Sequence, residues 1–225
     1  VFLRRSIEKA QDNEVHTLVF TINTFGGRVD SALQMATLIG SLDEIHTVAY
    51  IPADPEGLGV SWSAGALISF ACTEIYMAPG TSIGAAAPVF QTSEGTQQAG
   101  EKTVSAVRAQ MAALAEKNGY PKEVAIAMVD EEVELVEIRE NNQYRFELTD
   151  DGERNADSGV LSPAGKLLTL TAGEMEEYGI SSGTLSPISS LLTELEIVSP
   201  LTITPTVADR MVGFLTGAAV TSILL

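Results

Sequence analysis

Ser63, a serine set among small residues, has the setting of a nucleophile. It is followed by Ala64, Gly65 and Ala66 and then by an apolar run that predicts a helix. A serine at the head of a helix lies beside unpaired backbone N–H groups and the positive end of the helix dipole. These groups can hold a nucleophile and stabilise an oxyanion. The alternative interpretation is that Ser63 only caps a buried helix, because serine is a preferred N-cap residue.

The base that would activate this serine is more readily a lysine than a histidine. The two histidines, His16 and His46, each begin a predicted buried strand, and neither follows Ser63. Burial favours the neutral amine of a lysine, so a lysine can serve as a base. Lys102 heads a long helix with one apolar face, where its charge opposes the helix dipole. The alternative is an exposed Lys102 that is compensated by Glu101. The other lysines fall at predicted surface positions: Lys9, Lys117, Lys122 and Lys166.

Two glycines supply a candidate oxyanion hole. Gly26 and Gly27 follow a predicted buried strand at its carboxyl end, where ligands bind in α/β sheets. Glycine lets an N–H group face a cleft with no Cβ in the way. The second donor would be the N–H of Ala64, next to the nucleophile. A tight strand-to-helix turn without a site is the alternative.

Strands and helices alternate in the elements that must position these residues. Strands are predicted at 16–23, 46–51 and 75–77, and helices at 2–12, 29–42, 102–118 and 122–129. This order predicts an α/β domain with parallel strands. The first of these strands is a continuous apolar and β-branched run, typical of a strand covered on both faces.

The second half of the chain predicts further elements. Residues 133–138 and 144–148 read as a β-hairpin, and the segment from 91 to 100 reads as a polar, mobile loop. A short strand at 167–170 is followed by helices at 172–178 and 187–197, with a polar loop at 150–162.

Composition excludes several classes of protein. The chain has 225 residues, of which 45% are hydrophobic, so a sizeable core is expected. Its formal net charge of −17 argues against nucleic-acid binding and against docking on anionic lipid. The single cysteine, Cys72, excludes a disulfide framework and is interpreted as a small core residue.

Both ends of the sequence suggest a longer protein. No signal peptide is visible, and the chain opens within a predicted helix, so we expect an N-terminal truncation. Residues 211–225 carry no charge. They are fewer than the ~20 residues that cross a bilayer, so they predict the start of a truncated transmembrane segment. A buried C-terminal helix is the alternative.

Taken together, these segments resemble the ClpP-like serine peptidases. INTFGGRVDSA (22–32) resembles the strand-to-helix turn that carries the family's Gly-Gly oxyanion element, and WSAGALI (62–68) resembles its nucleophile helix. YMAPGTSIGAAAPV (76–89) is most similar to the membrane-bound branch, the NfeD family of stomatin-operon partner proteins. LLTLTAGEMEEYGI (167–180) resembles the C-terminal segment of that branch. Signal peptide peptidase A is a more distant relative.

The resemblance implies a fold and a mechanism. The fold would be α/β, a ClpP/crotonase-like fold of stacked β-β-α units with an inserted β-hairpin. Ser63 would attack the scissile carbonyl, Lys102 would be the base, and the amides of Gly27 and Ala64 would hold the oxyanion. No metal or organic cofactor is expected.

The resemblance also implies domains and partners. Residues 1–197 would form the peptidase domain without its N-terminal strand, 198–210 a linker, and 211–225 the start of the membrane segment. The enzyme would be a membrane-associated serine endopeptidase. Its substrates would be apolar peptides, such as the C-terminal region of a stomatin-like membrane partner. A dimer-based homo-oligomer is expected, with the peptidase domain on the extracytoplasmic side.

Some features depart from the family pattern. Phe25 stands where proline is usual, and Asp130, near a position where the branch has an acidic residue, is expected to end a helix.

Two other functions remain open. A catalytically weak membrane scaffold would keep the fold without turnover. A crotonase-like acyl-CoA enzyme would use the same oxyanion hole, but the net charge of −17 and the Ser63–Lys102 pair argue against it.

Overall fold

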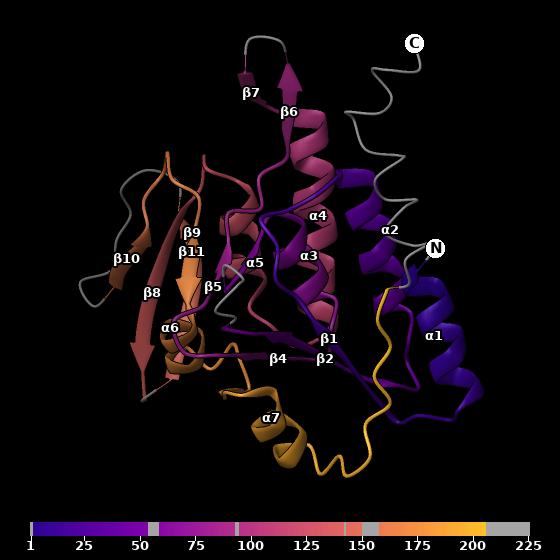
Figure 1. The fold of residues 1–225 in the computed structure, drawn as a ribbon. Coiled ribbons are helices and arrows are strands. Elements are labelled where there is room, and N and C mark those ends of the chain that lie inside the picture. The colour runs from indigo at the N-terminus through magenta and orange to yellow at the C-terminus, as the bar shows by residue number, and fades with distance from the viewer. Residues whose placement is uncertain (1, 54–58, 93–94, 142, 150–157, 206–225) are drawn as a thin grey trace, which may run out of the picture.

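A parallel sheet forms the centre of the molecule (Figure 1). The computed structural model describes residues 2–53, 59–92, 95–141, 143–149 and 158–205. The sheet contains β1 (Thr17–Thr21), β2 (His46–Ile51), β4 (Glu74–Met77) and β12 (Gly183–Thr184) in the order β1-β2-β4-β12. Every neighbouring pair in it is parallel, which confirms the predicted strand direction.

The helices of the described part lie around this sheet. They are α1 (Phe2–Asp12), α2 (Val29–Gly40), α3 (Ala64–Phe70), α4 (Glu101–Lys117), α5 (Lys122–Val129), α6 (Ala172–Glu177) and α7 (Ile188–Glu194). These helices agree with the predicted ones to within a few residues at each end.

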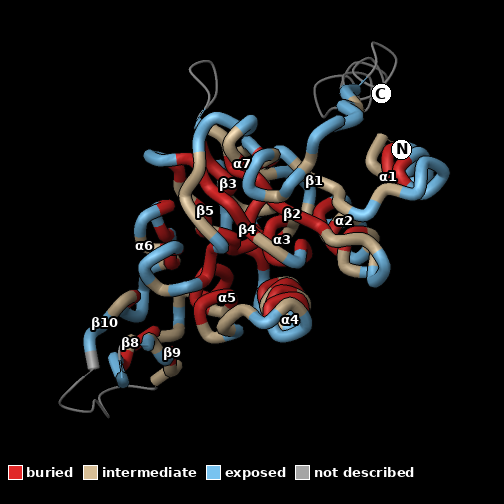
Figure 2. Tube along the Cα trace, turned by 90° about the horizontal axis from the view of Figure 1, so that it is seen from below, coloured by how far each residue is buried: buried red, intermediate tan, exposed pale blue. Residues whose placement is uncertain are grey.

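The sheet is buried on both faces because its strands carry apolar residues at successive positions. One set of side chains faces the main core together with α2, α3, α4 and α5: Ala49, Ile51, Ile75 and Met77. The alternate set packs against Leu191 of α7: Val48, Tyr50, Tyr76 and Ala78. Figure 2 shows this burial in red along β2, β4, α3 and the inner side of α4. The helices therefore form two layers, with the sheet between them.

Strand β1 is less buried than its sequence predicts. Four of its five positions are half-buried and the last is exposed. It lies at the edge of the sheet among the described strands, so one side of it has no neighbouring strand. The apolar run alone does not distinguish an edge strand from a central one.

A second, smaller sheet holds the segment around Ser63. It contains β11 (Thr169–Thr171), β5 (Ser82–Gly84) and β3 (Val60–Trp62) in the order β11-β5-β3. Strand β5 is parallel to β3 and antiparallel to β11. The predictions include β5 only as a small-residue run and do not include β3, because three-residue strands give no periodic pattern.

The predicted hairpin is confirmed and has a third strand. It consists of β8 (Glu134–Glu140) and β9 (Gln143–Thr149), and β10 (Ser158–Ser162) pairs with β8. The loop prediction is therefore wrong at the end of the 150–162 segment, while residues 150–157 lie outside the described part. These strands form a separate sheet on one side of the molecule, near α6 (Figure 1).

The predicted loop from 91 to 100 is also largely a hairpin. It contains β7 (Gly95–Gln98) and the end of β6 (Val89–Thr92), which project beyond the start of α4 (Figure 1). Backbone pairing such as Phe90 with Gln97 builds it. Its polar sequence lacks the alternation that marks a strand, which is why the sequence predicted a loop.

The terminal predictions have different outcomes. Helix α1 is present, as predicted. The expected membrane segment at 211–225 lies outside the described residues. Among the helices of the described part, none has both the length and the apolar character to cross a membrane.

Candidate active site

Ser63 lies at a strained turn between β3 and α3. Its φ of 55° and ψ of −117° are rare for a residue with a side chain. Ser63 occupies the N-cap position of α3, but its side chain makes no capping hydrogen bond. The hydroxyl is therefore not used as a cap. Strained residues of this kind persist only where the surrounding structure holds them, and they cluster at functional sites.

Backbone hydrogen bonds hold this turn from both sides. The Ser63 N–H donates to the Gly84 carbonyl of β5 at 3.0 Å. One residue earlier, the Trp62 N–H donates to the Thr24 carbonyl at 3.0 Å, and the Thr24 N–H donates to the Val60 carbonyl at 2.8 Å. The segment after β1 and the strand before Ser63 are thus joined directly at the site.

The small residues after Ser63 are required by close packing. A Cβ on Gly65 would lie 2.8 Å from the Ser61 hydroxyl and 2.9 Å from a methyl group of Thr24. The Ser61 hydroxyl in turn hydrogen-bonds to that of Ser69 at 3.0 Å, one turn further into α3. These contacts bring the start of α3 against β3 and so fix the direction in which Ser63 projects.

Of the two glycines predicted near the oxyanion hole, Gly26 lies directly against the serine and Gly27 shares a cavity with it. Gly26 has a φ of +134°, and a Cβ there would lie 2.8 Å from the Ser63 Cβ and 2.9 Å from its Oγ. Gly27, Ser63 and Ala64 line a common cavity of about 20 Å³, with room for about one water molecule. Small and apolar side chains complete its lining: Val29, Ala32, Leu67, Ala86, Pro88 and Val107.

Two of the backbone donors beside this cavity that have no acceptor among the described residues belong to the predicted oxyanion hole. They are the N–H groups of Gly27 and Ala64. Ala64 is the first residue of α3, so its N–H has no intrahelical partner. The N–H of Ser63 itself is occupied by Gly84. The arrangement of a hydroxyl beside two unpaired N–H donors suits acyl transfer through an oxyanion.

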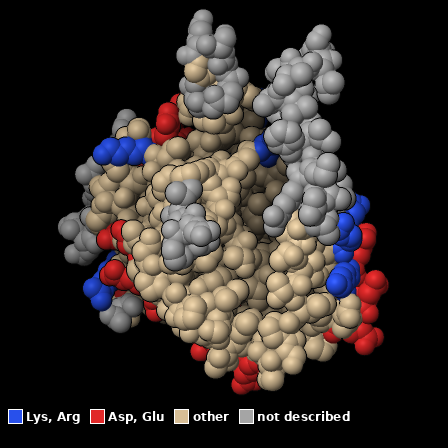
Figure 3. Space-filling view, viewed as in Figure 1, with Lys and Arg blue, Asp and Glu red and all other residues tan. Residues whose placement is uncertain are grey.

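Lys102 is not among the residues that line the cavity. It is on the first turn of α4 and exposed, and its side chain has no hydrogen bond or ion pair with another described residue. Val107, on the buried face of the same helix, lines the cavity. The structure therefore brings Ser63, Gly27 and Ala64 together around one cavity, while Lys102 is exposed and outside its lining. Figure 3 shows a hollowed face with charged side chains mainly around its margins.

An ion-pair network that sequence reasoning missed anchors the start of α4. Arg108 bonds to the buried carboxylate of Asp130, and its other guanidinium nitrogen lies 3.1 Å from Glu101. The pairing with Asp130 raises the pKa of Arg108. Asp130 ends α5, as predicted, and also accepts the Glu132 N–H at 3.0 Å. The network connects α5 to the turn that carries Lys102.

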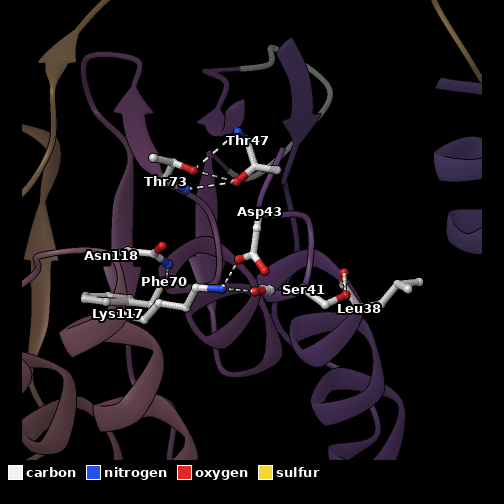
Figure 4. Close-up of polar contacts among 9 residues, drawn as sticks. Leu38, Ser41, Asp43, Thr47, Phe70, Thr73, Lys117 and Asn118 are labelled. Carbon is white, nitrogen blue, oxygen red and sulfur yellow. Dashed lines mark hydrogen bonds and ion pairs between the residues drawn. The ribbon is translucent and has the colours of Figure 1, made fainter. Parts of the chain in front are cut away.

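Most other candidate bases are engaged elsewhere. Lys117, at the opposite end of α4, bonds to the Asp43 carboxylate at 2.6 Å and to the Gly40 carbonyl (Figure 4). Lys122 lies 4.0 Å from Glu116.

Both histidines lie at the amino ends of their strands, opposite the edge that carries Ser63. The His46 ring nitrogen Nε2 lies 3.2 Å from a carboxylate oxygen of Glu74, and the backbone N–H of His46 donates to the carbonyl of His16. In the described residues, no group of His, Cys, Asp and Glu is arranged to hold a metal ion.

Comparison with known proteins assigns the chain to a family. Residues 1–157 match the family described as NfeD1b, N-terminal domain. The chain is 34% identical over 194 residues to membrane protein NfeD1b of Bacillus subtilis (strain 168). That alignment covers 86% of this chain and 37% of the relative, so the chain spans just over a third of the relative's length.

Solved structures of the 1510-N membrane-bound stomatin-specific protease share the fold. A lysine-to-alanine variant in complex with a substrate peptide has a TM-score of 0.68 and 20% identity, over 95% of this chain and 89% of that one. A serine-to-alanine variant has a TM-score of 0.62 and 22% identity, over 85% and 75%. The protease specific for a stomatin homolog from Pyrococcus horikoshii has a TM-score of 0.61 and 19% identity, over 95% and 89%. These similarities confirm the expected ClpP-like α/β fold.

Proposed function

The chain belongs to the NfeD1b N-terminal domain family, and from this premise we propose that it is the peptidase domain of a membrane-associated serine endopeptidase. Its nucleophile is Ser63 and its base is Lys102, with the N–H groups of Gly27 and Ala64 as the oxyanion hole. The observation that carries the proposal is the strained, uncapped Ser63 beside two N–H groups that have no acceptor in the described part.

The proposed reaction follows from these positions. The Ser63 Oγ attacks the carbonyl carbon of the scissile peptide bond while the neutral Lys102 amine takes the hydroxyl proton. The resulting oxyanion accepts hydrogen bonds from the Gly27 and Ala64 N–H groups. Collapse of this intermediate breaks the C–N bond, and Lys102 gives its proton to the leaving amine. A water molecule, activated by the same amine, then hydrolyses the acyl-enzyme.

Substrate binding completes the site in this proposal. Lys102 is exposed in the structure, and an exposed ammonium is well solvated. An apolar peptide that covers the start of α4 would displace this water and favour the neutral amine. The residues around the cavity suit such a peptide, because Pro88, Val89 and Phe90 continue from it onto the β6–β7 hairpin.

The relatives suggest the partner. The solved neighbours are described as specific for stomatin or a stomatin homolog, and the curated relative is named a membrane protein. We therefore propose an apolar segment of a stomatin-like membrane protein as substrate for this chain, and a dimer-based homo-oligomer as its assembly. The peptidase domain would lie on the extracytoplasmic side.

One observation favours a second function. Lys102 has no interaction with Ser63 among the described contacts, so a scaffold that keeps the peptidase fold with little turnover is the second candidate. It would bind the same membrane partner without cleaving it.

Cleavage of apolar peptides by the purified domain tests the proposal. We expect the wild type to cut, and Ser63→Ala and Lys102→Ala each to lose at least about 10²-fold in rate, the usual contribution of acid–base catalysis. Lys117→Ala is the matched control, because Lys117 occupies the other end of the same helix and pairs with Asp43. Products are identified by mass spectrometry.

The outcomes separate the candidates. Full activity in Lys102→Ala would show that the base is misassigned. Binding of apolar peptides without cleavage by the wild type would favour the scaffold.

A further inference from the structure

Two aromatic rings lie beside the reactive serine and take no part in the proposed chemistry. Phe25 directly precedes Gly26, and Trp62 directly precedes Ser63. Their ring centroids are 5.5 Å apart, with 51° between the ring planes. Phe25 is 57% exposed, which is unusual for a phenylalanine, while Trp62 is half-buried. An exposed apolar group beside a site is informative because burying it on binding is favourable.

The Trp62 ring is held in place. Its Nε1–H donates to the Ser82 hydroxyl at 2.9 Å, and its backbone N–H donates to the Thr24 carbonyl. The indole therefore has a fixed orientation and presents a rigid wall against which Phe25 packs. A rigid apolar surface loses little conformational entropy when a ligand covers it.

The aromatic pair is adjacent in sequence to the residues that would hold the reacting bond. The backbone of Gly26 lies against the Ser63 hydroxyl, and each ring is on the residue next to one of these two. An extended peptide advances about 3.3 Å per residue. Neither ring is among the residues that line the cavity, so the pair would meet a substrate side chain beside the cavity and not inside it.

We propose that Phe25 and Trp62 form an aromatic wall that selects an aromatic or branched aliphatic substrate side chain directly beside the scissile bond. This inference rests on the proposed peptidase function. Its occupant is apolar because the exposed surface that continues from the cavity is apolar, with Val89 49% and Phe90 52% exposed. Arg28, which follows Gly27 in the sequence, pairs with Asp30.

The chain carries its own reporter for this contact. Trp62 is the single tryptophan, so any change in tryptophan emission reports on the wall itself. The inactive Ser63→Ala variant is titrated with peptides that are identical except for phenylalanine, leucine, alanine or lysine beside the scissile bond. We expect a saturable change in emission, with the phenylalanine and leucine peptides binding about 3- to 10-fold more tightly than the alanine peptide.

Removing one ring should remove this selectivity. In the Ser63→Ala background, Phe25→Ala should bind the phenylalanine and alanine peptides about equally. Ile188→Ala is the control, since Ile188 is also exposed but lies on α7, on the other side of the sheet. In the active enzyme, Phe25→Ala should abolish the same preference in kcat/KM while the alanine peptide is still cut.

The two proposals fail in different ways. Selective binding without cleavage by the wild type would overturn the peptidase function and leave the aromatic wall intact. Cleavage with equal kcat/KM for all four peptides would overturn the wall and leave the function. A preference for the lysine peptide, or unchanged emission with every peptide, would also overturn it.

Discussion

At the scale of single residues, the site depends on two unusual backbone conformations. Ser63 has a φ of 55° and Gly26 a φ of +134°, and the two residues lie in direct contact. Only glycine adopts the second conformation without strain. The orientation of Ser63, the proposed nucleophile, is therefore set partly by a residue that has no side chain.

Substitution of Gly26 tests this dependence. Gly26→Ala would place a methyl group 2.8 Å from the Ser63 Cβ, so the serine must shift. We expect peptide cleavage to fall by about 10²-fold, since a displacement of about 1 Å at a reacting group has this effect. Gly173→Ala, where a Cβ meets nothing within 4 Å, is the control and should retain activity. Equal activity in both variants would contradict the role given to Gly26.

At the scale of elements, α4 is anchored at both ends. Arg108 and Asp130 tie its first half to α5, while at its other end Lys117 pairs with Asp43 and the Asn118 side chain donates to the Phe70 carbonyl at 2.9 Å (Figure 4). The two ion pairs differ in burial. Asp130 has 6% of its side chain exposed, whereas Asp43 has 75%.

This difference predicts unequal costs. Asp130→Asn leaves Arg108 without its buried partner and should lower the free energy of unfolding by about 2–4 kcal/mol. Asp43→Asn breaks an exposed pair and should lower it by less than about 1 kcal/mol. Urea denaturation of the two variants measures both values. If the two variants lost equal stability, the Arg108–Asp130 pair would not be the anchor described.

The elements differ in how well their sequences predict them. Strand β2 and helix α5 have long apolar patterns and agree with the prediction at both ends. The β6–β7 hairpin has no such pattern, because its backbone pairs while Val89 and Phe90 stay exposed. Strand β3 is three residues long and is formed by its neighbours in space, which a local pattern does not include.

The features of the candidate site also differ in how well the sequence predicted them. The sequence predicted that Ser63 lies at the head of a helix near Gly26 and Gly27, and the structure adds close packing around Gly26 and Gly65. The pairing of Arg108 with Asp130 and the contact between Phe25 and Trp62 join residues that are distant in sequence. Such contacts form only in the assembled fold, so no local sequence pattern predicts them. The role of Lys102 stays a prediction.

At the scale of the whole molecule, one main core joins the sheet to the helices on its active-site side. Cys72 belongs to it and is fully buried, with its thiol directed to the Ile68 carbonyl. Burial raises the pKa of the Cys72 thiol. The reactive thiolate is therefore disfavoured in the folded state at neutral and mildly alkaline pH.

Cys72 should act as a reporter of global unfolding. At pH 8 a thiol reagent such as Ellman's reagent should label the native protein at least about 10³-fold more slowly than the protein in urea, because the unfolded fraction is small. Absorbance of the released chromophore follows the reaction. Rapid labelling of the native protein would show that this part of the core opens locally.

The connection between β5 and β11 affects when the site can form during synthesis. The Ser63 N–H is held by Gly84, and Gly84 packs so closely on Leu168 that a Cβ would lie 2.4 Å from its carbonyl oxygen. β11 ends at Thr171, about a hundred residues after the serine. At 5–20 residues per second, roughly 5–20 s pass between their translation. A ribosome-bound chain therefore exposes the serine well before it can complete the turn, so the proposed proteolytic activity would be withheld from the nascent polypeptide during that interval.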